Sequence, residues 1–179
     1  QNIFNRDALL ASSTASTVRI LASQNTDRSK IDVVVDVTKA FYDVLATAQQ
    51  VKVSDQSISR LEKSLEQAYD RYTSGLADKT DYKRATILLG NAKAERKANS
   101  EALGFKQQYL KTLMGYPLNR DLPIEYDTVK MENEVMLDTL QQMNYTEHID
   151  YKILYTQREL QSSNVKYSYW RFLPSLSAF

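Results

Sequence analysis

The chain has 179 residues, and its 23 Lys and Arg side chains nearly balance its 22 Asp and Glu side chains, leaving a formal net charge of +1. A charge balance this even supplies no general attraction to nucleic acid or to an anionic membrane, so we expect neither as an electrostatic partner. Cysteine is absent, which excludes disulfides and cysteine-based metal sites. No stretch approaches the roughly 18 consecutive apolar residues that a membrane helix requires.

The first long helix is predicted from the absence of glycine and proline in its sequence. Residues 1–74 contain neither glycine nor proline, and they are rich in residues that favour helices. This composition predicts a helix from about Arg6 to Tyr72, roughly 100 Å long at 1.5 Å per residue. We expect a break near residues 24–27, because the polar side chains there compete for backbone hydrogen bonds.

Apolar residues recur in this helix at a spacing of seven. One row consists of Val37, Val44, Val51, Ile58, Leu65 and Tyr72. A second row consists of Phe41, Ala48, Leu61 and Ala68, with a slip where Asp55 and Glu62 interrupt it. A sevenfold repeat sustained over this length predicts helices that wind around one another in a left-handed coiled coil.

The next segment, residues 73–80, predicts a tight turn between two antiparallel helices. Gly75 suits the left-handed conformation that ends a helix, and either Asp78 or Thr80 suits the first position of the next helix. Asp81 would then lie in the first turn, near the positive end of the helix dipole. The second helix should run from about Thr80 to Met114, where Gly-Tyr-Pro at residues 115–117 ends it.

The remaining residues predict shorter elements. Residues 118–133 form a connector, with residues 122–126 extended, and short helices follow at about 134–143 and 147–172. Pro174 ends the last helix, and the alternation of Ser and Leu or Ala after it predicts the start of a strand. The fold class is therefore all-α, with a long helical hairpin over residues 1–115 and shorter elements over residues 116–179.

No arrangement of residues predicts catalysis, a cofactor or a metal, so we do not expect an enzyme. The single histidine, His148, has no second histidine or cysteine to share a metal, and its structural role is the better interpretation. Acidic clusters at Glu132, Glu134, Asp138, Glu147 and Asp150, and a basic cluster at Lys93, Arg96 and Lys97, are typical of solvated helix faces. The aromatic cluster of Tyr151, Tyr155, Tyr167, Tyr169 and Trp170 favours amphipathic packing over base stacking.

Four short motifs resemble one known family when they are taken in order. Arg71-Tyr72-Thr73-Ser74-Gly75, followed by Asp81, resembles the hairpin turn of TolC-like outer-membrane efflux proteins. The stretch from Val37 to Leu45, the Leu-x-x-Leu-x-Gly ending at Gly115 and the Pro174 strand start are similar to the same family. The chain departs from the family's frequent Arg-Pro-Asp, because it has His148-Ile149-Asp150 at that place.

The resemblance implies a fold and a cellular setting. Members of the family are trimers in which barrel strands cross the outer membrane and long helices form a periplasmic tunnel, with short equatorial helices around it. This chain would supply tunnel-wall helices and equatorial helices of the first structural half, without the β-barrel. It would belong to an efflux or export channel in the outer membrane of a Gram-negative cell, and it would form a homotrimer in the full-length protein.

The resemblance also implies partners and a contact site. In the family, the periplasmic tip of the hairpin meets a periplasmic adaptor protein that is linked to an inner-membrane pump. The corresponding residues here are Arg71, Tyr72, Gly75, Leu76 and Asp81. Arg71 and Asp81 would pair across the turn or bind the adaptor, and the simpler alternative is that they only cap the two helices.

The main alternative is a soluble coiled-coil scaffold or adaptor protein that mediates protein–protein contacts and transports nothing. It explains the sevenfold spacing equally well, but it does not explain the strand start after Pro174 or the order of the four motifs. A helical-bundle enzyme that uses the acidic clusters with a metal is a further alternative, and a titration with divalent cations would distinguish it.

Overall fold

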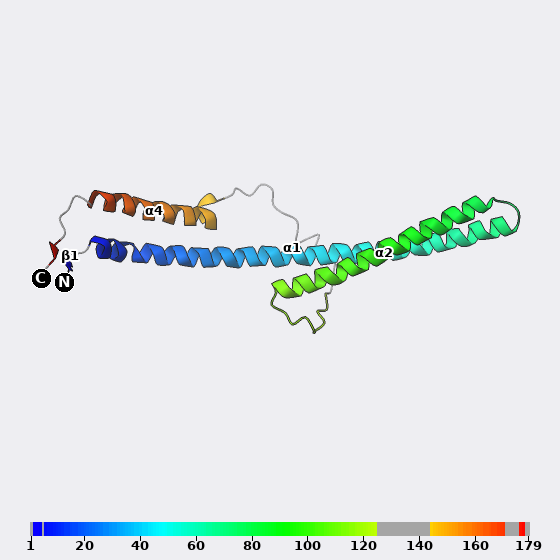
Figure 1. Ribbon diagram of the computed structural model, residues 1–179, viewed down its shortest axis with the longest axis horizontal. Coiled ribbons are helices and arrows are strands. Elements are labelled where there is room, and N and C mark those ends of the chain that lie inside the picture. The colour runs from blue at the N-terminus through cyan, green and yellow to red at the C-terminus, as the bar shows by residue number, and fades with distance from the viewer. Residues whose placement is uncertain (1, 5, 125–143, 171–175, 178–179) are drawn as a thin grey trace. The chain divides into compact units, whose positions relative to one another are not determined.

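The protein is almost entirely helical in its computed structural model, which describes residues 2–4, 6–124, 144–170 and 176–177. Its elements are the strands β1 (Asn2–Phe4) and β2 (Leu176–Ser177), the helices α1 (Arg6–Thr73), α2 (Lys79–Leu113) and α4 (Ile149–Tyr169), and the 3-10 turn η1 (Tyr145–Glu147) (Figure 1). The predicted helical fold class is confirmed at this level. Among the helices described, none is both long and apolar enough to cross a membrane.

Helix α1 is continuous over 68 residues, so the predicted break at residues 24–27 is wrong. Hydroxyl groups in and just after this stretch bond to carbonyls of the same helix, and Asp27 pairs with Lys30. The Thr26 hydroxyl donates to the Ala22 carbonyl at 3.0 Å, and the Ser29 hydroxyl donates to the Asn25 carbonyl at 3.0 Å. Hydrogen bonds to the preceding turn let such residues remain inside a helix.

Two glycines end the long helices in the same way. Gly75 has a φ of 73° and Gly115 a φ of 63°, both in the left-handed region that favours glycine. After Gly75, the Leu76 N–H donates to the Arg71 carbonyl at 2.8 Å, and after Gly115, the Tyr116 N–H donates to the Lys111 carbonyl at 2.8 Å. Both are Schellman motifs, which satisfy carbonyls at a helix end, so the predicted role of Gly75 is confirmed.

The later predicted elements are found in part. Helix α4 lies within the range of the helix predicted at 147–172, and the η1 turn lies at the beginning of that range and just before it. Strand β2 lies in the segment for which we predicted a strand start. Residues 122–124 belong to no helix or strand, and their predicted extended conformation stays a prediction. The predicted helix at 134–143, residues 125–126 and residues 171–172 lie outside the described residues.

Contacts divide the chain into two compact units, and the boundary falls within α1. Unit 1 comprises residues 1–34 and 132–179, and unit 2 comprises residues 35–131. The ranges 1–115 and 116–179 that we drew from the sequence follow helix ends rather than contacts, and they stay a prediction.

Unit 1 joins the first part of α1 to α4 in an antiparallel arrangement. Arg28 forms an ion pair with Asp150 at 3.3 Å, and the Tyr167 hydroxyl donates to the Asp7 carboxylate. Strands β1 and β2 pair antiparallel, with Phe4 opposite Leu176. We did not predict β1, because three residues carry too little pattern to identify a strand.

Unit 2 is built on a small apolar core where α2 ends. Val44 and Leu110 are each 1% exposed, and Ala40 is 6% exposed. The half-buried residues that pack around them are Val37, Phe41, Leu103, Leu113, Leu122 and Ile124. The connector after α2 thus returns to cover the same core.

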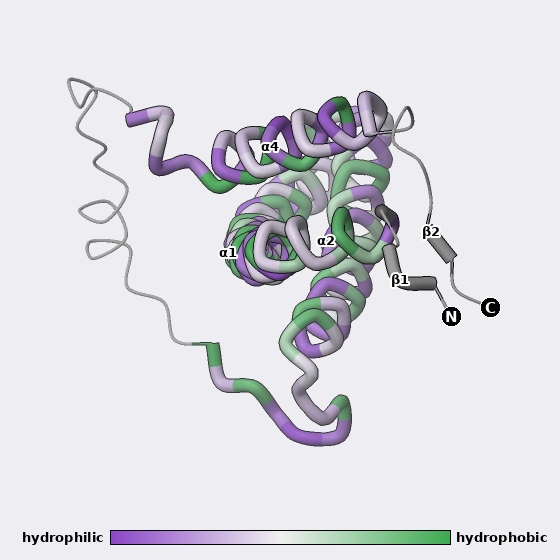
Figure 2. Tube along the Cα trace, turned by 90° about the vertical axis from the view of Figure 1, so that its left-hand side faces the viewer, coloured by the Kyte–Doolittle hydropathy of each residue, from purple (hydrophilic) through white to green (hydrophobic). Residues whose placement is uncertain are grey.

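The side of α1 that faces α2 differs in part from the predicted rows. Val44 of the first row is buried, as its spacing indicated. The other buried positions of α1 are Ala40, Leu45 and the polar Ser54, whereas Phe41 and Ala48 are only half-buried. Hydrophilic and hydrophobic residues are interspersed along the helices (Figure 2).

Candidate functional site

The turn between α1 and α2 brings the five predicted site residues to one end of unit 2. Arg71 and Tyr72 lie in the last turn of α1, Gly75 and Leu76 lie in the loop, and Asp81 lies in the first turn of α2. We call this end, residues 69–85, the tip. The left-handed Gly75 is what allows the chain to reverse within a few residues.

Leu76 is the most exposed large apolar side chain at the tip. It follows the left-handed glycine of the Schellman motif, a position whose apolar side chain often packs back on the preceding helix turn. Here the side chain is 81% exposed. Single exposed apolar residues are common on protein surfaces, and this one lies in a turn that is closed by backbone hydrogen bonds to Arg71.

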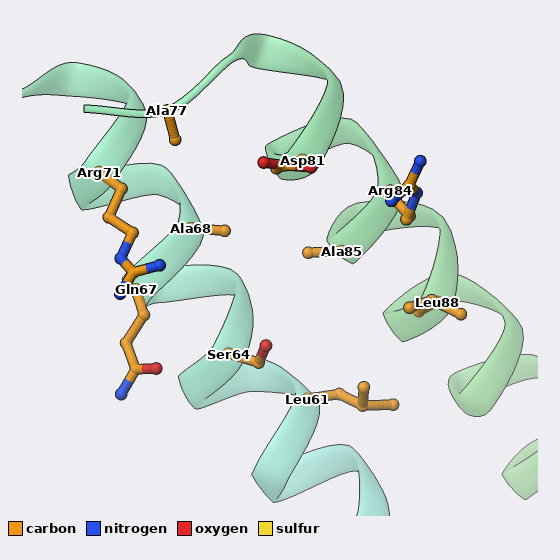
Figure 3. A pocket seen from close by; sticks show the side chains of 10 residues that line it. All are labelled: Leu61, Ser64, Gln67, Ala68, Arg71, Ala77, Asp81, Arg84, Ala85 and Leu88. Atoms are coloured by element: carbon orange, nitrogen blue, oxygen red, sulfur yellow. The ribbon is translucent and has the colours of Figure 1, made fainter. Parts of the chain in front are cut away.

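A groove of about 360 Å³ lies between α1 and α2 directly behind the turn (Figure 3). Its floor is made by small residues, with Ala68 of α1 and Ala85 of α2 directed toward one another across the gap (Figure 3). Its other lining residues are Leu61, Ser64, Gln67, Arg71, Ala77, Asp81, Arg84 and Leu88. The short side chains leave room for an inserted side chain, and the charged residues surround that opening.

Arg71 and Asp81 both line this groove. The ion pairs found among the described residues do not include one between the Arg71 guanidinium and the Asp81 carboxylate. The Arg71 side chain runs back along α1 rather than toward α2 (Figure 3). Its backbone carbonyl accepts hydrogen bonds from Leu76 and Ala77 at 2.8 and 3.2 Å, so the residue helps to close the turn through its main chain. The predicted pairing across the turn is absent, and the adaptor contact stays a prediction.

Asp78, rather than Thr80, occupies the first capping position of α2. Its backbone is extended, with φ −77° and ψ 152°, and its side chain makes no capping bond to the helix. The carboxylate instead accepts a hydrogen bond from the Thr80 hydroxyl at 3.0 Å. The Asp81 N–H donates to the Asp78 carbonyl at 3.2 Å, and the Asp81 carboxylate remains available at the groove.

Three tyrosines link the two helices at the tip. The rings of Tyr72 and Tyr82 are nearly parallel, with centroids 6.2 Å apart, and Tyr69 lies 5.4 Å from Tyr82. Tyr72 was predicted as a site residue, whereas Tyr69 and Tyr82 were not. Tyr69 lies six residues before Gly75 and Tyr82 lies seven residues after it, and this symmetry about the turn could have identified the cluster. Aromatic pairs of this geometry contribute beyond the burial of their area, so the cluster holds the tip together.

The residues that we considered for chemistry have structural partners. His148 caps α4, because its Nδ1 accepts a hydrogen bond from the Asp150 N–H at 3.3 Å. In the basic cluster, Lys93 pairs with Glu62 at 2.9 Å and Arg96 pairs with Asp55 at 2.9 Å, across the two helices. Lys97 lies 3.9 Å from Glu101 on the same helix.

Neither the acidic clusters nor the aromatic cluster forms a recognisable chemical site in the described ranges. No group of three potential metal ligands occurs there, and Glu132, Glu134 and Asp138 lie outside them. Tyr167 packs edge-on against Trp170 with centroids 6.3 Å apart. Tyr151, Tyr155 and Tyr169 are 47%, 50% and 69% exposed. One of these tyrosines, Tyr167, therefore packs against another ring, whereas the other three are exposed on the surface of unit 1.

Comparisons with known proteins add no family to this description. No family model, curated protein or solved structure matches the chain. The resemblance to TolC-like proteins therefore depends on the four sequence motifs alone.

Proposed function

We propose that this chain is part of an outer-membrane efflux or export channel, in which α1 and α2 contribute to the wall of a periplasmic helical tunnel. In this proposal the tip docks on a periplasmic adaptor protein that is linked to an inner-membrane pump. Solutes would pass through the tunnel without covalent change, and the chain would assemble as a trimer with the barrel strands of the full-length protein.

The observation that carries the proposal is the tip itself. The motif that resembles the family turn forms a tight turn, with Gly75 in the left-handed conformation and Leu76 81% exposed. Directly behind it lies the groove whose floor consists of alanines and a serine. An exposed apolar side chain beside a groove with room for a partner's side chain is the arrangement expected of a docking end.

The length and surface of the helices support a wall function. Helix α1 has 68 residues, which corresponds to about 100 Å. Large apolar side chains remain exposed along α2, among them Ile87 at 63% and Phe105 at 70%. A helical pair with this much uncovered apolar surface favours burial against neighbouring helices, as tunnel walls provide.

Conductance measurements test the channel. The purified gene product that contains this chain would be reconstituted into a planar lipid bilayer, after fractionation of the cell envelope. We expect stepwise ion conductance and recovery with the outer membrane. A product that is recovered only in soluble fractions and gives no conductance would contradict the proposal and favour the soluble scaffold.

A further inference from the structure

A series of polar contacts joins α1 and α2 along the middle of the pair, in the stretch between the buried Leu89 and the buried Leu110 of α2. The Lys106 ammonium donates to the Thr47 hydroxyl at 2.8 Å, and the Asn99 amide lies 3.4 Å from the Ser54 hydroxyl. The two ion pairs Arg96–Asp55 and Lys93–Glu62 continue the series toward the tip, each at 2.9 Å. We call these eight residues the polar segment: Thr47, Ser54, Asp55, Glu62, Lys93, Arg96, Asn99 and Lys106.

Several of these residues occupy positions where a helical pair usually places its core. From Leu89 to Leu110, the α2 residues nearest α1 recur at alternating spacings of three and four, and both ends of this series are buried. The members of the series are Leu89, Ala92, Arg96, Asn99, Leu103, Lys106 and Leu110. A polar residue at such a position weakens the pair but specifies how the two helices align.

The four contacts of the polar segment lie close to one alignment of the two helices, and long side chains let the pairs differ by a few residues: Glu62 lies 14 residues before Leu76, and Lys93 lies 17 residues after it. Counted from Leu76, Thr47 lies 29 residues before and Lys106 lies 30 residues after it. Asp55 lies 21 residues before Leu76, and Arg96 lies 20 residues after it. If one helix shifts by one residue, it moves by about 1.5 Å along its axis, and the residue that faces the other helix is replaced by one about a quarter turn away. Such a shift would separate all four pairs of contacting side chains at once.

The ion pairs of the polar segment are too exposed to act mainly as a source of stability. Their side chains are between 45% and 54% exposed, and pairs in such positions contribute little to folding. Their effect is larger on misaligned states, where cations would meet cations or lose their carboxylates. The polar segment therefore selects one alignment among several that the alanine-rich middle of α2 would pack equally well.

We propose that the polar segment aligns α1 with α2 and thereby sets the shape of the tip groove. Asp55, Glu62, Lys93 and Arg96 are then positioning residues, which act through the helices without touching a partner. Glu62 is the direct neighbour of the groove residue Leu61, and Lys93 lies five residues after the groove residue Leu88. The role of the groove as a docking site depends on the function proposed above, whereas the alignment itself does not.

Spin labels can measure the alignment directly, because the chain has no cysteine of its own. Cysteines at Lys63 of α1 and Ile87 of α2 lie outside the groove lining, and Ile87 is 63% exposed. Pulsed electron spin resonance would report the distribution of distances between the two labels in the full chain. We expect one narrow distribution for the chain with native charges.

Charge reversal tests the proposal, and charge restoration controls for damage. The double variant Asp55→Lys and Glu62→Lys leaves five cations and no carboxylate in the polar segment, and we expect a broadened distribution with a component shifted by about 5 Å, one helical turn. Adding Lys93→Glu and Arg96→Glu should restore the narrow distribution. The matched control exchanges Lys97 and Glu101, a pair within α2, and should leave the distribution unchanged.

Circular dichroism separates misalignment from unfolding. If the reversal variant loses its helical signal, the neutral variant Asp55→Asn and Glu62→Gln takes its place, with the same expected broadening at smaller amplitude. An unchanged distribution in the folded variants, or a restored charge pattern that fails to restore the distance, would overturn the proposal. If the chain with native charges shows the narrow distance distribution but its tip does not bind an adaptor protein, that result would contradict the proposed function and leave the alignment proposal standing.

Discussion

Two regions of the α1–α2 pair are held together in different ways: the base, which is the apolar core around Val44 and Leu110, and the middle, which is the polar segment. At the base, Val44 and Leu110 are each 1% exposed and pack with Ala40. In the middle, Asp55, Glu62 and their partners on α2 are about half exposed and meet through charges. The same two helices thus use burial at one end and ion pairs further along.

The difference separates stability from alignment. Burying a Leu or Val side chain contributes roughly 1.5–3 kcal/mol, whereas an exposed ion pair contributes about 0–1 kcal/mol. The hydrophobic effect is not directional, because it depends mainly on the apolar area that is removed from water. The base should therefore determine whether the pair folds, and the middle should determine how its helices align.

The largest expected effect is at the base. Leu110→Ala removes a fully buried side chain and should lower the free energy of unfolding by about 2–5 kcal/mol. The matched control is Ile87→Ala on the same helix, where the side chain is 63% exposed and the change should stay within about 0.5 kcal/mol. Urea denaturation followed by circular dichroism measures both. Equal losses would show that the base is not the source of stability.

An intermediate effect is expected at the tip. Gly75→Ala forces a side chain into the left-handed region and should cost about 1–2 kcal/mol. Gly90→Ala is the matched control, because Gly90 lies within α2 and a Cβ there would meet nothing within 4 Å. That change should stabilise the protein by about 0.5–1 kcal/mol. Thermal unfolding curves should therefore shift in opposite directions, and a shift in the same direction would contradict the role given to Gly75.

The smallest expected effect is in the middle of the pair. A double-mutant cycle of Asp55→Ala and Arg96→Ala should give a coupling energy of about 0.2–1 kcal/mol. The coupling should fall in 1 M salt, where the Debye length is about 3 Å. Urea titrations of the four proteins at two salt concentrations measure it. A coupling of several kcal/mol that resists salt would mean that the middle, too, is a stabilising region.

The sequence predicted the long helices closely because glycine marks their ends. Helices expected at about 6–72 and 80–114 are found at Arg6–Thr73 and Lys79–Leu113. Left-handed glycines leave a clear signal, since few other residues adopt that conformation. The break expected at residues 24–27 was wrong because local propensity does not reveal where a hydroxyl will bond.

Features that depend on two segments meeting in space were missed. Asp55 and Glu62 look like a slip in the sevenfold repeat, and only the alignment with α2 identifies Arg96 and Lys93 as their partners. The tyrosine cluster around Tyr82 and the pairing of β1 with β2 depend on the same kind of information. For the candidate site, the sequence indicated Gly75 and Leu76, but the groove behind them depends on side chains from both helices.

Site-specific photocrosslinking at Leu76 tests the central claim, that the tip docks on a partner, most directly. A photoreactive amino acid would replace Leu76 in the full-length gene product in its own cells, and Leu118, which is 61% exposed in the connector, is the matched position. We expect a crosslink to a periplasmic adaptor protein from position 76 and none from position 118, with the captured protein identified by mass spectrometry. Absence of a crosslink from position 76, or the same capture from both positions, would contradict the account.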